Sequence, residues 1–426
     1  MLKSVHRSLV ISCVLGSAVL AFGSEAVWPL ATTTPEASGF SPERLDTLHG
    51  NLRKVVDDGK YSGYVLLLAR DGQIVDWRAY GSQDLDARTP MQRDSIIKIF
   101  SMSKIVTSVA VLMLLEEGKL KLGDPVEKYL PALKNRKVYE SGPADAPVLV
   151  AAKRSVTIRD LLTHTAGNYY DEAWSSEAVP MELMKRVKLW ESTNLDDFVG
   201  RVAQTPLHEQ PGTRYRYGIS TDLLGAIVEK TSGQSLDVFF QQRIFAPLGM
   251  RDTSFWVPKE KRARLATIYS RDPAGKLVPN KEANYELAGP TRPFFSGGGG
   301  LYSTAGDYVR FAQMLLDGGQ LDDVRILGRK TVELMTQNHI GHLADPHPFG
   351  IPSQGFGLGV RTLTELGEST LLGSPGMFGW DGAATTNVQI DPTERTVALL
   401  LLQHFPFNED DIFATFTNGY FSALVD

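Results

Sequence analysis

The chain has 426 residues, a mildly acidic balance of 44 Lys and Arg against 49 Asp and Glu, and 42% hydrophobic residues. This length suits one large domain or two intertwined ones. Because no basic run is interleaved with aromatic residues, the composition argues against a nucleic-acid partner. The only cysteine, Cys13, lies in the N-terminal apolar run, so a chain that has lost this run has no disulfide and no thiol chemistry.

The N-terminal segment has the layout of a signal peptide. Met1 to Arg7 is a short basic region, and the apolar run from Leu9 to Phe22 is too short to span a bilayer comfortably. Gly23 before Ser24 is a plausible cleavage site. We therefore expect a signal peptide over 1–23, a domain over 24–426, and export to the periplasm or medium without stable membrane insertion.

The first elements of the domain are a helix and a hairpin. Ser41 and Pro42 form an N-cap and N1 pair, and the apolar residues that follow keep helical spacing as far as Gly59. The apolar stretches 64–69 and 73–80 flank Asp71-Gly72, which is a strong two-residue hairpin signal.

The most informative tetrad is Ser101-Met102-Ser103-Lys104, at the start of an apolar helix that ends at Gly118. Residues three apart on a helix share one face, so Lys104 Nζ is expected within reach of Ser101 Oγ. A serine hydroxyl is a weak nucleophile until a neighbouring group accepts its proton, and an amine supplies that acceptor. This is the Ser-x-x-Lys arrangement of β-lactamases and penicillin-binding proteins. The structural alternative is that Ser101 only caps the helix.

A second copy of the pattern occurs at Ser95-Ile96-Ile97-Lys98. Its β-branched centre after a polar turn predicts a strand. Positions three apart on a strand point to opposite faces, so Ser95 and Lys98 are not expected to meet.

The rest of the chain predicts an α+β fold. Residues 131–155 are rich in Lys, Pro and Gly and indicate a surface excursion. Helices are expected from Thr157, over 223–230 and from Ser303 through Leu315, followed by strands over 382–390 and 397–402 and a closing helix over 410–424. We expect one antiparallel sheet built from both chain ends (about 27–105 and 290–426) and flanked by helices, with a mainly helical region inserted at about 106–289.

Acyl transfer also needs a proton-handling partner and an oxyanion hole. The proposed partner is Tyr217, since a phenol near a Lys ammonium loses its proton more easily; Tyr215 is a competing candidate. The glycine-flanked stretch Gly379-Trp380-Asp381-Gly382-Ala383 is expected beside the nucleophile, where its backbone N–H groups complete an oxyanion hole with that of Ser101. No Gly-x-Ser-x-Gly elbow occurs in the chain, which argues against an ordinary α/β-hydrolase.

Taken together, the chain resembles the serine hydrolases of the class C β-lactamase fold, in particular the bacterial carboxylesterases of family VIII. The resemblance implies that Ser101 is the acylated nucleophile, that Lys104 and Tyr217 handle the proton, and that the N–H groups of Ser101 and Ala383 form the oxyanion hole. It rests on six motifs in the family's order: Ser101 to Lys104, Val156 to Gly167, Pro211-Gly212-Thr213, Tyr217-Gly218-Ile219, Gly297 to Thr304 and Gly379 to Ala384.

Two departures from the lactamase pattern favour esters. Ile219 stands where lactamases of this fold have an Asn that binds a substrate amide, and Trp380-Asp381-Gly382 stands where they have Lys-Thr-Gly. We expect all four residues to line the substrate site and Asp381 to repel the carboxylate of a β-lactam or D-alanyl peptide. Lys230-Thr231-Ser232-Gly233 lies at a helix end and is not that motif.

These observations predict a carboxylesterase for small, uncharged acyl esters, with no cofactor and no metal. The alternatives are a β-lactamase or D-alanyl peptidase, an acyltransferase of the same fold, and a catalytically silent wall-binding protein. The spacing of His339, His342, Asp345 and His347 does not fit a metal site. His164 is expected to be structural, and nothing in the sequence decides the role of His404. The four-glycine run at Gly297 is expected to let the backbone pass close to the cleft, and the candidates for the pocket wall are Tyr169, Tyr170 and Trp174.

Overall fold

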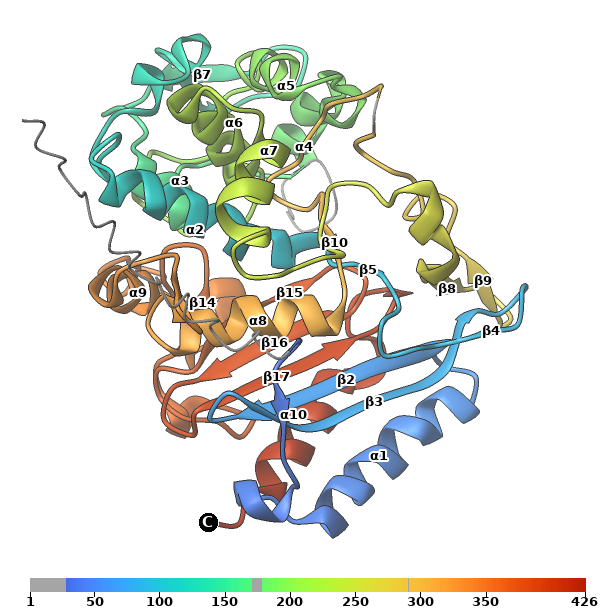
Figure 1. The fold of residues 1–426 in the computed structure, drawn as a ribbon. Coiled ribbons are helices and arrows are strands. Elements are labelled where there is room, and N and C mark those ends of the chain that lie inside the picture. Colours follow the sequence, from blue (N-terminus) through green and yellow to red (C-terminus); the bar gives the residue numbers. More distant parts are fainter. Residues whose placement is uncertain (1–27, 171–177, 290) are drawn as a thin grey trace, which may run out of the picture.

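The computed structural model describes residues 28–170, 178–289 and 291–426, and it contains a large sheet below a mainly helical region (Figure 1). The sheet has the strand order β1-β3-β2-β17-β16-β15-β14-β13, with β4 pairing onto β3. All neighbouring pairs are antiparallel except β1 with β3. Its strands are β1 Ala31–Thr32, β2 Gly63–Arg70, β3 Gln73–Asp84, β4 Thr89–Pro90, β13 Gln354–Phe356, β14 Arg361–Leu363, β15 Phe378–Gly382, β16 Thr386–Asp391 and β17 Thr396–Leu401.

The α+β class, with a sheet made from both chain ends, is therefore confirmed. The central contact joins the two ends directly, because β17 pairs with β2 from Thr396 opposite Arg70 to Leu401 opposite Val65. The hairpin between β2 and β3 turns at Asp71 and Gly72, with φ of 50° and 75°. Positive φ at both turn residues gives a twist that matches the strands.

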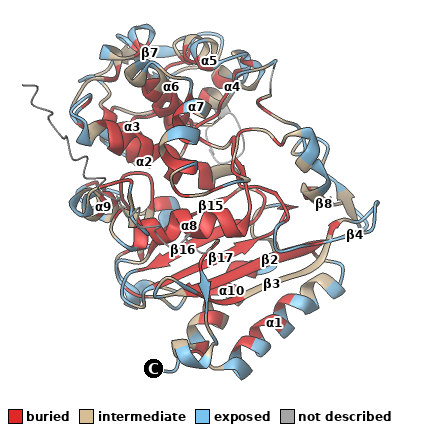
Figure 2. Ribbon diagram, in the orientation of Figure 1, coloured by how far each residue is buried: buried red, intermediate tan, exposed pale blue. Residues whose placement is uncertain are grey.

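Helices cover both faces of this sheet. Alternate residues of β2 enter two separate cores: Leu66 and Leu68 pack with α1 (Pro42–Asp57) and α10 (Ile412–Ala423), while Val65 and Leu67 face the core shared with α8 (Ala305–Leu316). This is why β2 is apolar throughout rather than alternating. Figure 2 shows the central strands and α8 buried, and α1 exposed along its outer side.

The helical region packs around α2 (Ser103–Glu116), which is buried over nearly its whole length. It contains α3 Ile158–Leu162, α4 Ala178–Arg186, α5 Leu195–Val202, α6 Ser220–Ser232 and α7 Leu236–Phe240. The helix expected from Thr157 begins with a full capping box formed by Thr157 and Asp160. Gly118 follows α2 with φ 68°, which is the left-handed conformation that ends helices.

The sequence patterns miss several short elements. The stretch 131–155 contains a β-hairpin of β6 (Lys137–Ser141) and β7 (Val148–Ala151), and the strand expected from Gly382 is interrupted by a turn at Ala383–Thr385 that separates β15 from β16. The remaining elements are β5 Ile97–Lys98 paired with β10 Tyr302–Ser303, β8 Tyr269–Arg271 between β9 Leu277–Pro279 and β18 His404–Phe405, β11 Gln320–Leu321 with β12 Val324–Arg325, and α9 Arg329–Thr336.

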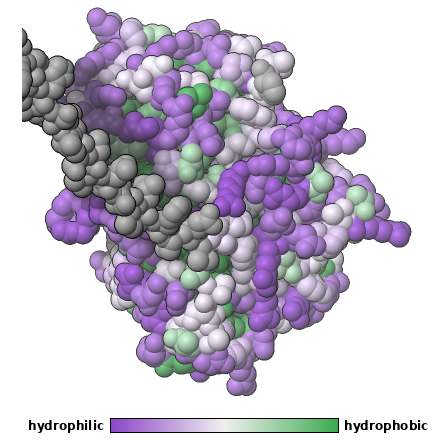
Figure 3. Space-filling view, viewed as in Figure 1, coloured by the Kyte–Doolittle hydropathy of each residue, from purple (hydrophilic) through white to green (hydrophobic). Residues whose placement is uncertain are grey.

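The predicted signal peptide (1–23) and Trp174 lie outside the described residues. Within the described ranges, every helix is too short or too polar to cross a bilayer. The face seen in Figure 3 is mostly hydrophilic, with hydrophobic side chains scattered over it.

Candidate active site

Ser101 lies in a short 3₁₀ turn, Phe100–Met102, that leads directly into α2. Met102, and not Ser101, is the N-cap residue of α2, so the alternative that Ser101 merely caps the helix does not describe this geometry. The preceding Phe100 has φ 43°, a conformation that costs a non-glycine residue on the order of 1–3 kcal/mol. The sharp turn presents the Ser101 side chain to a cavity.

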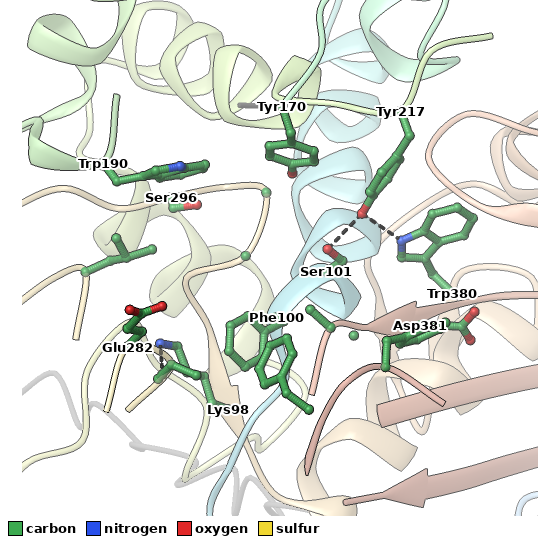
Figure 4. A pocket seen from close by; sticks show the side chains of 18 of the residues that line it. Lys98, Phe100, Ser101, Tyr170, Trp190, Tyr217, Glu282, Ser296, Trp380 and Asp381 are labelled. Atoms are coloured by element: carbon green, nitrogen blue, oxygen red, sulfur yellow. Dashed lines mark hydrogen bonds between the residues drawn. The ribbon is translucent and has the colours of Figure 1, made fainter. Parts of the chain in front are cut away.

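The hydroxyl of Ser101 accepts two hydrogen bonds. Lys104 Nζ donates to Ser101 Oγ at 3.0 Å, and the Tyr217 hydroxyl donates to it at 2.7 Å (Figure 4). The structure therefore brings together the three side chains that the sequence proposed for proton transfer. Tyr217 comes from the segment just before α6, 116 residues along the chain from Ser101.

Lys104 is buried and uses three hydrogen bonds. Besides Ser101, its Nζ donates to the Tyr170 hydroxyl at 2.9 Å and to the Gly298 carbonyl at 2.7 Å. Three acceptors satisfy the three N–H groups of an ammonium. Tyr170 was expected only as a wall residue, whereas it contacts the amine itself.

Aromatic rings enclose Tyr217. Trp380 Nε1 donates to the Tyr217 hydroxyl at 3.3 Å, and the ring of His164 lies 4.9 Å from that of Tyr217. Burial, and then the charge of Lys104, hold the pKa of His164 well below its ordinary value. His164 is therefore neutral and packs the tyrosine in place, in keeping with the structural role expected of it.

Tyr215 does not join this group. Its hydroxyl is buried without a hydrogen-bond partner among the described residues, and burial raises its pKa well above the ordinary value. Its ring packs 5.1 Å from that of Phe356. Of the two tyrosines that the sequence offered, only Tyr217 reaches the nucleophile.

The four-glycine run passes close to the cleft, as expected, since Gly298 and Gly299 line the cavity, and it also contacts α2 and α6. The Asp222 carboxylate accepts hydrogen bonds from Ser296 Oγ at 2.6 Å and from Gly298 N at 3.0 Å, while the Gly297 carbonyl accepts one from Thr107 Oγ1 at 2.7 Å. A Cβ on Gly298 would collide with the Asp222 carboxylate. Sequence reasoning missed Asp222, whose only signal is a carboxylate on the otherwise apolar inner face of a helix.

The cavity in front of Ser101 has a volume of about 710 Å³, within the range of roughly 300–1,000 Å³ typical of small-molecule sites. The charged side chains of its wall are those of Lys98, Glu282, Arg361 and Asp381. Figure 4 shows Lys98 and Glu282 on one side of Ser101 and Asp381 on the other. Its walls are largely aromatic: Phe100, Tyr170, Trp190, Tyr217, Tyr285, Phe349, Trp380, Phe405 and Phe407.

The residues of the expected oxyanion hole also line this cavity. Ser101, Gly382 and Ala383 are all on its wall. A side chain at Gly382 would strike the Ile99 carbonyl and Thr386 Oγ1, so only glycine lets the end of β15 lie this close to the nucleophile turn. That approach brings the Ala383 backbone to the same cavity as Ser101.

Asp381 lines the cavity as expected, but its expected effect on substrates needs correction, and so does the expected position of Ile219. The Asp381 carboxylate is paired with the Arg361 guanidinium at 2.5 and 3.2 Å and accepts a bond from Asn387 Nδ2 at 2.5 Å. The pairing with Arg361 compensates its charge, and the carboxylate points away from Ser101 (Figure 4). The expected repulsion of anionic substrates therefore does not follow. Ile219 is fully buried in the core and is not among the cavity-lining residues.

The other histidines that the sequence raised lie outside the cavity wall. The His339 ring contacts Arg159 Nη1 at 2.9 Å and the Leu334 carbonyl at 2.8 Å. His404 contacts Glu409 Oε2 at 2.7 Å. Within the described ranges, no cluster of three or more His, Cys, Asp or Glu has the arrangement of a metal site.

The chain is similar in sequence and in structure to proteins of one family. Residues 48–417 match the family model described as Beta-lactamase. The chain is 30% identical over 355 residues to lovastatin esterase of Penicillium rubens, covering 78% of this chain and 84% of that protein. It is 29% identical over 411 residues to an Escherichia coli protein whose name suggests a D-alanyl-D-alanine carboxypeptidase, covering 89% and 86%. The solved structure of EstCE1, a hydrolase with promiscuous acyltransferase activity, superposes with a TM-score of 0.76 at 26% identity, covering 89% of this chain and 98% of that one.

Proposed function

Because the chain belongs to the beta-lactamase family and is a serine hydrolase of that fold, we propose that it is a carboxylesterase that cleaves small, uncharged acyl esters through an acyl-Ser101 intermediate. The observation that carries the proposal is the position of Ser101 Oγ, 3.0 Å from Lys104 Nζ and 2.7 Å from the Tyr217 hydroxyl, inside an aromatic-lined cavity. An esterase among its relatives supports the choice of ester over amide.

The proposed reaction has two acyl transfers. Ser101 Oγ attacks the ester carbonyl carbon while its proton passes to whichever of Lys104 and Tyr217 is unprotonated. The N–H groups of Ser101 and Ala383 are proposed to stabilise the oxyanion. The carbon–oxygen bond to the alcohol then breaks, and the alcohol leaves with the transferred proton. Water repeats the sequence on the acyl-serine and releases the acid.

The β14–β15 side of the cavity wall favours neutral substrates. A β-lactam or a D-alanyl peptide presents a carboxylate, and binding it calls for an uncompensated cation. On the β14–β15 side the cation is the Arg361 guanidinium, which already forms an ion pair with the Asp381 carboxylate. The Trp380 indole, 4% exposed, supplies apolar surface in the same strand.

A substrate panel with covalent labelling tests the proposal. Nitrophenyl esters of rising acyl length, a chromogenic cephalosporin and a D-alanyl-D-alanine peptide are compared by kcat/KM, and a fluorophosphonate adduct is located by mass spectrometry. The adduct is expected on Ser101 and absent from Ser101→Ala. Ser95→Ala is the matched control, because Ser95 Oγ contacts Gln83 and not a lysine, and it is expected to retain labelling. Higher efficiency on the cephalosporin or the peptide than on every ester would overturn the esterase assignment.

A second candidate is acyl transfer to an alcohol, which is favoured by the likeness to EstCE1. The acyl-Ser101 intermediate would then react with an alcohol in place of water. If this activity is present, adding a short alcohol during hydrolysis of a nitrophenyl ester is expected to yield a new ester. Where acylation of Ser101 limits the rate, the rate of nitrophenol release should stay unchanged. A reaction that yields only the free acid excludes it.

We also propose that the protein is exported, on the basic and apolar layout of residues 1–23. Expression of the full chain with cell fractionation tests this. Activity in the periplasm or medium, and an N-terminus at or near Ser24, are the expected results, whereas full-length protein in the cytoplasm would contradict them.

A further inference from the structure

The second Ser-x-x-Lys tetrad places its lysine on the cavity wall. Ser95 Oγ turns to Gln83, whereas Lys98, only 3% exposed, lines the same cavity as Ser101. The backbone of Lys98 is fixed on both sides by Gln403, which accepts from Lys98 N at 3.0 Å and donates to Lys98 O at 3.1 Å. Lys98 is therefore rigidly held three residues before the nucleophile.

The Lys98 ammonium contacts the neighbouring segment 280–287, on the same side of the cavity. Its Nζ donates to the carbonyls of Ala283 at 3.0 Å and Tyr285 at 2.7 Å, and lies 4.8 Å from the ring centres of Phe100 and Tyr285. The segment 280–287 has no helix or strand, and it supplies one side of the cavity wall (Figure 4) through Asn280, Glu282, Ala283, Tyr285 and Leu287.

We propose that Lys98 is a specificity-determining residue, whose ammonium ties segment 280–287 across one side of the cavity and so limits the length of the substrate group that fits there. This inference rests on the proposed esterase function. The Lys98 ammonium donates to Ala283 and Tyr285 rather than to Ser101, so its effect is expected on the choice of substrate rather than on the chemical step.

The charge of Lys98 matters to this tie. Hydrogen bonds from an ammonium are roughly twice as strong as neutral ones. Burial lowers the pKa of Lys98 to about 8, an effect that Glu286 opposes. The other titratable groups near it are Glu282 on the cavity wall and the phenols of Tyr285 and Tyr302. The ammonium is therefore lost across the mildly alkaline range, and the tie weakens with it.

Variants test the tie directly. Lys98→Met removes both hydrogen bonds, Lys98→Arg keeps a cation, and Arg262→Gln breaks an ion pair to Glu286 on the same segment without touching Lys98. Each is assayed with nitrophenyl esters from acetyl to dodecanoyl and with acetate esters of alcohols of rising length. Lys98→Met is expected to raise the long-to-short ratio of kcat/KM in one series by about 10-fold or more, the size of effect that methylene-scale pocket changes have. Lys98→Arg and Arg262→Gln are expected to stay close to the wild type.

A pH measurement on the wild type and Lys98→Arg covers the case in which Lys98→Met does not fold. Two esters of different length share one proton relay, so their kcat/KM ratio cancels the common pH dependence. The proposal expects this ratio to shift towards the longer ester as the pH rises through about 8, and to stay flat in Lys98→Arg.

Failure of the inference is separate from failure of the esterase proposal. If no ester is hydrolysed and Ser101 is not labelled, the function is wrong. If esters are hydrolysed and labelling is normal, but the ratio is the same in Lys98→Met as in the wild type or is independent of pH, the role of Lys98 is overturned.

Discussion

The Arg361 guanidinium and the Asp381 carboxylate form a two-point ion pair, at 2.5 and 3.2 Å, between the neighbouring strands β14 and β15. The pair lies next to Trp380, and the Arg361 guanidinium sits 5.7 Å from the centre of the indole ring. Because of this ion pair, the positive charge of Arg361 on the cavity wall is already neutralised by Asp381. A carboxylate-bearing substrate gains little from such a cation, because it must compete with Asp381.

Breaking this pair should therefore change substrate charge preference. In Asp381→Asn, the Arg361 guanidinium keeps its charge and loses its counter-ion, so we expect the kcat/KM ratio of a chromogenic cephalosporin to nitrophenyl butyrate to rise by about tenfold, equivalent to ~1.4 kcal/mol. The double variant Asp381→Asn with Arg361→Gln removes both charges and is the matched control. An equal rise in the double variant would show that the freed cation is not the cause.

The two tyrosines before α6 offer an internal comparison. Tyr217→Phe removes the hydroxyl that donates to Ser101 Oγ at 2.7 Å, and loss of such a proton-transfer group is expected to lower kcat by roughly 10²–10⁴-fold. Tyr215→Phe removes a buried hydroxyl with no partner among the described residues, so activity and Tm should stay close to the wild type. A damaging Tyr215→Phe beside a mild Tyr217→Phe would reverse our assignment.

Lys104 and Tyr217 should behave as one unit. Lys104→Met is expected to lower kcat by roughly 10³-fold or more, and the double variant with Tyr217→Phe should cost little beyond the larger single effect, because groups in one relay are strongly non-additive. Additive losses would mean that the two groups act independently.

The core of the site could be predicted because local rules determine it. Ser101 and Lys104 lie three apart at a helix start, and the same period argument, applied to a strand, separated Ser95 from Lys98. Tyr170 and Gly298 could not be predicted as Lys104 partners, because 66 and 194 residues of chain separate them from the lysine. Their contacts depend on how α2, α6 and the glycine run pack together.

In the fold, too, local patterns predict some elements, whereas others depend on contacts between distant parts of the chain. Capped helices such as α1 and α8 and the Asp71-Gly72 hairpin follow from local patterns. Strand β15 has no clear strand pattern of its own because two of its five residues are glycines, which weaken such a pattern; only the family resemblance places Trp380 to Gly382 on a strand. The orientation of Asp381 also depended on a partner, Arg361, that is 20 residues away on another strand.

Gly382 gives a final test of the oxyanion hole, because the end of β15 approaches the nucleophile turn where no side chain fits. A Cβ at Gly382 would collide with the Ile99 carbonyl and Thr386 Oγ1, so Gly382→Ala must push the strand end, and with it the Ala383 amide, away from Ser101. Loss of one oxyanion-hole donor typically lowers kcat by about 10²–10³-fold. We expect a fall of that order in kcat with a smaller change in KM.

Gly367→Ala is the matched control for this substitution, because a Cβ there meets no atom within 4 Å, and it should leave both kinetic constants unchanged. Circular dichroism and the Tm of each variant separate local displacement from unfolding. If folded Gly382→Ala retains the wild-type kcat, the Ala383 amide does not stabilise the oxyanion, and the second donor must be sought elsewhere on the cavity wall.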